Sequence, residues 1–165
     1  MPLLNKKKSY ILCMRRKEGK YHQGKFNPRN PEKYKGKDIK NIIYRSSWEL
    51  KFMQWCDRRE SILEWGSEEF FIPYYDPTTR KVRRYFPDFY MKVEDKDGKI
   101  VRYVVEIKPK KQVLKPQKTP RKRDKTFLSE VLTWEKNQAK WKAAKEFCDD
   151  RMFKFSIITE DHLDL

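Results

Sequence analysis

Hydrophobic and polar positions along the chain predict two helices that flank a group of strands. Apolar residues recur at helical spacing over residues 48–58, and Ser46 or Ser47 directly before them can cap a helix. A second helix is predicted over residues 129–148, where tryptophan, alanine and cysteine side chains form one apolar stripe. Because these tryptophans follow helical spacing, we expect them to pack in a core.

Between the helices, three runs of aromatic and β-branched residues predict strands over residues 69–75, 84–93 and 100–107. Turn-forming residues separate the runs, so we expect three consecutive antiparallel strands, with the most apolar one at the centre. A last strand is predicted over residues 152–159. The order helix, three strands, helix, strand predicts an α/β domain with a mixed sheet of about four strands flanked by helices.

The positive charge of the chain is concentrated in two segments. The 165 residues include 40 Lys and Arg against 24 Asp and Glu, which gives a formal charge of +16. Residues 1–40 carry 13 basic and 3 acidic side chains, and residues 108–125 carry 9 and 1. We therefore expect a basic irregular N-terminal arm at 1–40, and a folded domain at 41–165 with a basic, proline-interrupted loop at 108–126.

This charge distribution favours a polyanionic partner, because basic side chains that bind phosphates release condensed counterions. The alternative is a pair of solvated charge runs that only aid solubility.

Composition also excludes several classes of protein. No apolar run approaches the roughly 18 residues of a membrane span, and the N-terminus lacks an apolar signal segment, so neither a membrane protein nor a secreted one is expected. Three distant cysteines and two histidines do not predict a zinc site.

Two carboxylates and a lysine stand where adjacent strands can bring them together. Asp88 lies in the predicted second strand, and Glu106 and Lys108 close the third. Side chains alternate along a strand, so Glu106 and Lys108 share a face, and a hairpin partner can place Asp88 beside Glu106. Like charges opposite each other are destabilising unless something positive lies between them. A divalent cation with oxygen ligands, beside a lysine, is suited to phosphodiester hydrolysis.

These residues also fit a longer pattern. PD at residues 87–88 and EIK at residues 106–108 resemble the PD-(D/E)xK signature of a nuclease superfamily that includes restriction endonucleases, junction resolvases and phage exonucleases. RSSWE at 45–49, YFPDF at 85–89 and EIKP at 106–109 are similar to the nuclease subunits of heteromeric transposases and to the head completion nucleases of T-even-type phages. The resemblance to the phage nucleases is the better one, because this chain is small and has basic arms. It implies a restriction-endonuclease-like core.

Together, the residues and the resemblance indicate a catalytic set of Glu49, Asp88, Glu106 and Lys108. The expected metal is Mg²⁺, with Mn²⁺ as an alternative, held by Asp88, Glu106, Glu49 and the main-chain carbonyl of Ile107. Each residue also has a plainer interpretation. Asp88 could be a polar residue at a strand start, Glu106 could form a structural ion pair, and Glu49 could be a solvated helix residue.

Basic side chains are expected to hold DNA by its backbone, because a proline-broken segment cannot keep the geometry needed to read base edges. The candidates are Arg45 and seven loop residues, Lys110, Lys111, Lys115, Lys118, Arg121, Lys122 and Arg123. Gln138 is a weaker candidate for an indirect role at the site. Some exonuclease branches have tyrosine four residues after such a glutamine, whereas this chain has Lys142, so an exonuclease-type grip on a DNA end is unsupported.

The resemblance implies a Mg²⁺-dependent endo- or exodeoxyribonuclease that trims packaged phage DNA, so that the head can be completed and joined to the tail. The expected partners are double-stranded DNA and phage portal or head–neck proteins. The expected location is the host-cell cytoplasm during assembly, with retention in the virion at the head–tail junction left open. One alternative is a non-catalytic basic DNA-binding or head–tail connector protein. Another is a junction resolvase or transposon-end endonuclease of the same superfamily.

Overall fold

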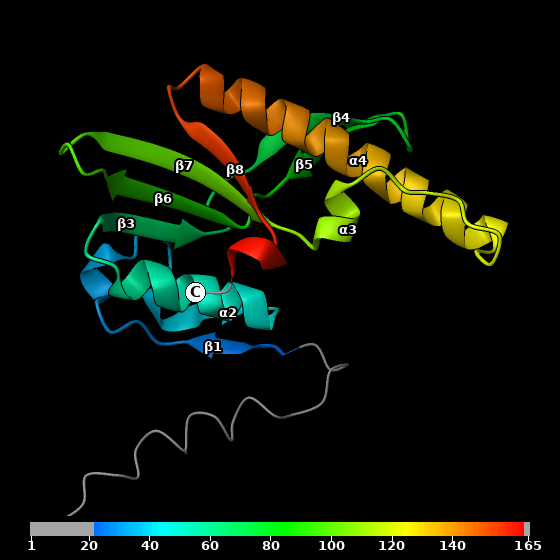
Figure 1. Ribbon diagram of the computed structural model, residues 1–165. Helices are drawn as coiled ribbons and strands as arrows, with labels where there is room; N and C mark the ends of the chain where they lie inside the picture. Colours follow the sequence, from blue (N-terminus) through cyan, green and yellow to red (C-terminus); the bar gives the residue numbers. More distant parts are fainter. Residues whose placement is uncertain (1–21, 164–165) are drawn as a thin grey trace, which may run out of the picture.

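A four-stranded sheet with a helix on each side forms the centre of the molecule in a computed structural model that describes residues 22–163 (Figure 1). Its strands are β3 (Ile62–Ser67), β6 (Phe89–Glu94), β7 (Ile100–Ile107) and β8 (Lys154–Ile158), in the order β3-β6-β7-β8. The first three pair antiparallel, and β8 runs parallel to β7. The predicted α/β fold with a mixed four-stranded sheet is therefore confirmed.

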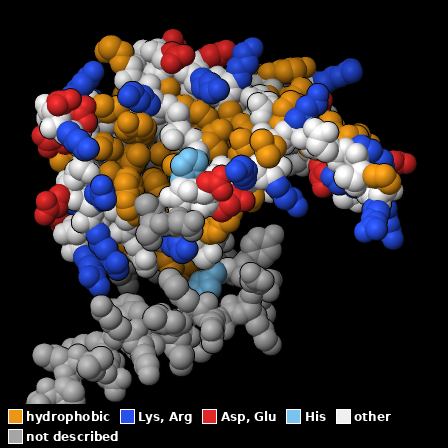
Figure 2. All heavy atoms as spheres, in the orientation of Figure 1, with side chains coloured by type: hydrophobic (Ala, Val, Ile, Leu, Met, Phe, Trp, Pro, Cys, Tyr) orange, Lys and Arg blue, Asp and Glu red, His pale blue; other side chains and the backbone are white. Residues whose placement is uncertain are grey.

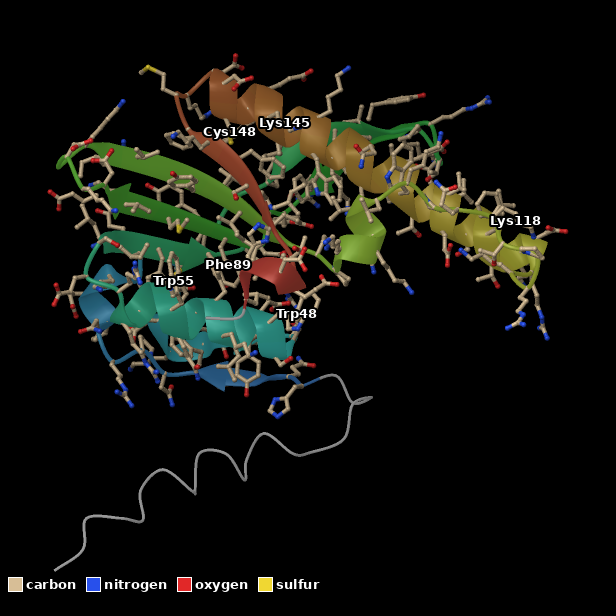
Figure 3. The ribbon with its side chains drawn as sticks, viewed as in Figure 1. Trp48, Trp55, Phe89, Lys118, Lys145 and Cys148 are labelled. Carbon is tan, nitrogen blue, oxygen red and sulfur yellow. The ribbon has the colours of Figure 1, made fainter. Side chains whose placement is uncertain are left out.

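Helix α2 (Ser47–Arg58) covers one face of the sheet, as predicted. The Ser46 side chain caps it by accepting a hydrogen bond from the main-chain nitrogen of Glu49 at 3.1 Å. The side chains of α2 that face the sheet are buried, and the Phe52 ring packs against Phe89 of β6 with 4.7 Å between centroids. Phe89 lies between the sheet and α2 (Figure 3). Burial of this aromatic face is what orients α2 on the sheet.

The other face is covered by helix α4 (Asp124–Asp149) and a two-stranded hairpin of β4 (Ile72–Asp76) and β5 (Lys81–Tyr85). Ile72 and Tyr74 of β4 and Tyr85 of β5 pack with Ala144 of α4, whereas the other residues of β5 are exposed. The N-terminal half of α4 projects beyond the sheet as an arm (Figures 1 and 2). Of the two predicted core tryptophans on α4, Trp141 is buried and Trp134 is half-buried under the short helix α3 (Lys110–Val113).

The predicted three-strand meander is wrong in two places. The strand expected at 84–93 is broken at Phe86–Asp88, because Pro87 lacks the N–H that would continue a ladder. Its first half pairs with the strand predicted at 69–75 to form the separate β4–β5 hairpin. The outer strand of the main sheet is β3, which the prediction missed because Glu64 and Gly66 interrupt its hydrophobic pattern.

The basic segment at 108–126 is more regular than predicted. A one-turn helix, α3 (Lys110–Val113), follows Pro109 at once, and α4 begins at Asp124 instead of residue 129. Proline is compatible with the start of a helix, so Pro109 does not prevent α3. The irregular stretch is reduced to residues 114–123.

Residues 22–40 do not form the predicted irregular arm, because they pack onto the domain; residues 1–21 of that predicted arm lie outside the described residues. Strand β1 (Gly24–Phe26) pairs antiparallel with β2 (Ile42–Tyr44), and two 3-10 turns, η1 (Pro31–Lys33) and η2 (Ile39–Asn41), lie between them. The aromatic residues of this segment, such as Phe26 and Tyr34, follow no helix or strand period, because they enter the core from short or irregular stretches of backbone. Pattern analysis of the sequence therefore does not detect them.

Two contacts fix this segment to the domain. Tyr34 and Phe26 pack edge-on against the buried Trp65 of β3, with ring centroids 4.9 and 5.8 Å away. Asp57 of α2 is 1% exposed and accepts hydrogen bonds from the main-chain nitrogens of Arg29 and Asn30.

Within residues 22–163, no helix has both the length and the apolar character of a membrane span.

Candidate active site

Asp88 and Glu106 point to the same face of the sheet. Phe89 and Val105 are register partners on β6 and β7, and both belong to the core under α2. Because side chains alternate, Asp88 and Glu106 next to them face the opposite side, toward the hairpin and α4. The Tyr85 hydroxyl of β5 reaches them there and donates a hydrogen bond to Glu106 Oε2 at 2.8 Å.

Glu106 and Lys108 form an ion pair at the end of β7. Glu106 is 2% exposed, and its Oε1 lies 2.8 Å from Lys108 Nζ. The main-chain nitrogen of Lys108 donates to the carbonyl oxygen of Ile158 on β8 at 2.9 Å, which fixes the backbone. Burial alone would lower the pKa of Lys108, but the charges of Glu106 and Asp88 outweigh it and the pKa is raised. Lys108 is therefore a cation at neutral pH.

The Asp88 carboxylate is held against the same strand. Its Oδ2 accepts a hydrogen bond from the main-chain nitrogen of Ile107 at 2.7 Å. Burial, and then the charge of Glu106, raise the pKa of Asp88 to about 7. Two carboxylates that resist being charged together are a donor set that a hard divalent cation would complement, so the site fits Mg²⁺ chemically.

Glu49 lies close enough to influence this pair but is engaged locally. Its Oε2 accepts from the main-chain nitrogen of Arg45 at 2.7 Å, and its Oε1 lies 3.2 Å from Ser46 Oγ. Its charge raises the pKa of both Asp88 and Lys108. Among residues 22–163, no three His, Cys, Asp or Glu side chains are gathered closely enough to hold a metal. The structure thus brings Asp88 and Glu106 together and leaves Glu49 at the edge.

Arg45 is tied to the site through a residue that the sequence did not indicate. Its guanidinium forms an ion pair with Glu68, and the main-chain nitrogen of Glu68 donates to the carbonyl oxygen of Asp88 at 3.2 Å. Glu68 has a φ of 51°, in the left-handed region, just after β3. No motif marks Glu68, because its role depends on β3 lying beside β6.

The basic loop presents only part of its charge to solvent. Lys110 pairs with Asp161, Lys118 with Asp124 and Lys122 with Glu130. Lys118 lies at the end of the arm, where Lys and Arg side chains gather (Figures 2 and 3). The remaining predicted loop contacts are exposed and have no ion pair among the described residues, namely Lys111, Lys115, Arg121 and Arg123.

Comparison with known proteins agrees with this geometry. The sequence pattern of the TnsA-like endonuclease N-terminal domain matches residues 59–160. The chain is also 43% identical over 145 residues to the head completion nuclease of Enterobacteria phage T4, which covers 86% of this chain and 93% of that protein. The chain belongs to the TnsA-like endonuclease family. The predicted resemblance to phage head completion nucleases and transposase nuclease subunits is thereby confirmed, and the TnsA-like segment contains Asp88, Glu106 and Lys108 but not Arg45 or Glu49.

Helix α4 of this TnsA-like domain brings two further polar residues near the cluster. Lys140 Nζ lies 5.6 Å from the centre of the Tyr85 ring, whose hydroxyl holds Glu106. Asn137, one turn earlier, lines a groove together with Lys108 and Lys140. Gln138 is half-buried, and no hydrogen bond of its side chain is found among residues 22–163. In the sequence, a place for Lys140 near the site is indicated only by its neighbour Trp141, which belongs to the apolar stripe of the predicted helix.

Proposed function

We propose that this chain is a divalent-metal-dependent nuclease that hydrolyses phosphodiester bonds in double-stranded DNA. The observation that carries the proposal is the convergence of Asp88, Glu106 and Lys108 on one face of the sheet, where Glu106 is buried and its charge raises the pKa of the half-buried Asp88. A structural ion pair would need only Glu106 and Lys108. Asp88 is a second carboxylate beside this pair. It accepts one main-chain hydrogen bond, from Ile107, but its charge repels that of Glu106, which favours a catalytic use.

Asp88 and Glu106, with the main-chain carbonyl of Ile107, would hold Mg²⁺ or Mn²⁺, and Glu49 would join them only by giving up its contacts with Arg45 and Ser46. When bound, such an ion polarises the scissile phosphate and lowers the pKa of a water molecule.

The residues of the chain hold the reacting groups. The Lys108 ammonium lies beside Glu106 and would stabilise the negative charge that develops on the phosphate. Tyr85 fixes the orientation of the Glu106 carboxylate through its hydroxyl.

We further propose that the substrate is the end of packaged phage DNA and that trimming it allows the head to be completed and joined to the tail. The similarity to the T4 head completion nuclease over nearly its whole length supports this role. Portal or head–neck proteins would then be partners, and the protein would act in the host cytoplasm during assembly, with or without retention in the virion.

The proposal is tested by incubating purified protein with linear and circular DNA, with and without Mg²⁺ or Mn²⁺. We expect cleavage only with the metal, and a loss of at least 100-fold in Asp88→Asn and Lys108→Ala. Cleavage of circular DNA would identify an endonuclease. Equal cleavage by the wild type and both variants would show that another site, or a contaminant, is responsible.

Two alternatives give different results. A non-catalytic connector, which the basic surface would also suit, would bind DNA in a salt-sensitive way and leave it intact with any metal. A junction resolvase or transposon-end endonuclease would cleave a four-way junction or a specific end faster than blunt or nicked duplexes of the same length. The same panel of substrates therefore separates all three functions.

A further inference from the structure

A groove runs from the proposed active site along one side of α4. Its lining comes from Lys108 at the end of β7, Thr78 in the β4–β5 turn, Gln112 in α3 and one stripe of α4. The stripe runs from Lys125 to Lys140, so at 1.5 Å per residue it is about 22 Å long. None of the residues that line the groove is acidic. Four of the lining residues are lysines. Lys108, Lys136 and Lys140 lie at the end nearest the candidate catalytic cluster and Lys125 at the other, with neutral residues between Lys125 and Lys136.

Lys140 is the lysine of this stripe nearest to the cluster. Its ammonium lies over the rings of Tyr85 and Tyr74 at 5.6 and 5.9 Å, and no carboxylate lies within 4 Å of it in the described part of the chain. Burial lowers the pKa of Lys140, and the charge of Lys108 lowers it further, against the attraction of Glu106. A partly buried cation without an ion-pair partner is costly in the free protein, and an anion in the groove would offset that cost.

Asn137 provides a second and independent observation. It is 5% exposed and lines the groove between Lys136 and Lys140, yet its Nδ2 finds no acceptor among residues 22–163. A buried amide donor without a partner destabilises a protein. Such a donor points to an acceptor that the free protein lacks.

The middle of the groove is held in place by Asp76 at the end of β4. Asp76 is fully buried, accepts hydrogen bonds from the main chain and hydroxyl of Thr78, and lies 3.7 Å from Lys136 Nζ. This arrangement fixes the hairpin turn against α4. The groove walls are thus built by packing and buried hydrogen bonds and not by the exposed loop alone.

We propose that this groove binds the phosphodiester backbone of the DNA strand, with Lys140 and Asn137 contacting the phosphate next to the one that is cleaved. The inference rests on the proposed function and adds the path of the substrate to it. Phosphate oxygens supply both the negative charge for Lys140 and the acceptor for the Asn137 amide. A base edge supplies hydrogen-bond acceptors but no negative charge, so it would not match Lys140.

The test measures binding separately from cleavage. An Asp88→Asn protein would be titrated in EDTA against a fluorescein-labelled 20-bp blunt duplex at several salt concentrations. Adding Lys140→Gln is expected to raise Kd about tenfold and to reduce the slope of log K against log salt by about one. Lys140→Arg should retain most of the affinity.

Lys142→Gln and Lys145→Gln serve as matched controls, because they remove the same charge from exposed positions of α4 outside the groove. Lys145 lies on the C-terminal part of α4, away from the projecting arm (Figure 3). We expect their Kd values to stay within twofold. Equal effects of Lys140→Gln and Lys142→Gln would mean that only net charge matters and would overturn the groove. Metal-dependent cleavage by the wild type, measured in parallel, shows whether the proposed function itself stands.

A neutral methylphosphonate placed at single positions of the duplex identifies the contacted phosphate. One position should weaken binding by the parent protein about tenfold and have little effect on Lys140→Gln, because the same contact cannot be lost twice. Additive losses at every position would contradict a direct contact.

Asn137→Leu distinguishes a binding residue from a structural one. We expect this variant to unfold at a higher temperature than the parent, because a buried unpaired amide is removed, and to bind DNA more weakly. A lower unfolding temperature would show that the amide stabilises the fold and would remove Asn137 from the proposal.

Discussion

Tyr85 has two roles, because its ring packs in the core under α4 while its hydroxyl holds a carboxylate of the candidate site. Glu106 has little access to water, so the hydroxyl and the Lys108 ammonium replace its hydration. The buried charge of Glu106 is therefore stabilised by two side-chain groups, the Tyr85 hydroxyl and the Lys108 ammonium.

Removing that hydroxyl tests its value to the fold. Tyr85→Phe keeps the ring and leaves Glu106 with one partner fewer, so we expect the free energy of unfolding to fall by about 2 kcal/mol in urea denaturation. Tyr75→Phe on the same hairpin is the control, since Tyr75 is 57% exposed and should change stability by less than about 0.5 kcal/mol. Similar losses in both variants would contradict the role given to the hydrogen bond.

Asp88 predicts how metal binding depends on pH. Its pKa of about 7 means that below pH 7 the carboxyl group is mostly protonated, and a cation must displace that proton. We expect the affinity for Mg²⁺, measured by calorimetry, to rise up to about tenfold per pH unit below pH 7 and to level off above it. A flat profile between pH 5 and 8 would show that Asp88 is not a ligand.

At the scale of elements, the β4–β5 hairpin and the middle of α4 form one unit joined by Asp76. Burial alone would raise the pKa of Asp76, but hydrogen bonds from Thr78 and Thr79 and the charge of Lys136 lower it to about 2. A carboxylate whose pKa is lowered on folding stabilises the protein above its ordinary pKa, near 4. That stabilisation is lost as the pH falls toward 2.

Asp76→Asn is therefore expected to lower the unfolding temperature at pH 7 by roughly 5 °C, and the difference from wild type should shrink between pH 4 and pH 2. Thermal melts followed by circular dichroism would measure this. Asp97→Asn, in the exposed β6–β7 turn, is the control and should match wild type throughout. A constant difference at every pH would show that packing, and not charge, explains the loss.

Elements with a clear period were predicted from sequence, and those fixed by distant contacts were not. Alternation along residues 100–107 places Glu106 and Lys108 on one face, and hairpin geometry brings Asp88 to them. The hairpin of β4 and β5 separates from the main sheet at Pro87 and packs against the apolar face of α4, a contact between residues distant in the sequence. Lys140 was missed for the same reason, since its place depends on how α4 crosses that hairpin.

For the whole molecule, the distribution of charge is predicted to govern how tightly DNA is held. Lys111, Lys115, Arg121 and Arg123 are exposed and lack ion pairs among residues 22–163, whereas Lys110, Lys118 and Lys122 are paired. The total charge of +16 alone does not distinguish these two sets. Their contributions to binding should differ, because a paired lysine must leave its carboxylate to reach a phosphate.

Replacing the four unpaired residues with glutamine should reduce the slope of log K against log salt by about three, as measured by fluorescence anisotropy. Replacing the three paired lysines should reduce it by less than about one and a half. Slopes that fall in simple proportion to the charges removed would contradict the distinction.

The parallel pairing of β7 with β8 has a consequence for synthesis of the protein. Glu106 is in register with Ile157, and the backbone of Lys108 is bonded to Ile158, so the strand that bears the cluster gains this neighbour only after α4 has been made. A nascent chain still on the ribosome therefore has all four candidate catalytic residues without the support that aligns them. We expect such a chain not to cleave nearby nucleic acid until β8 has been translated and paired with β7.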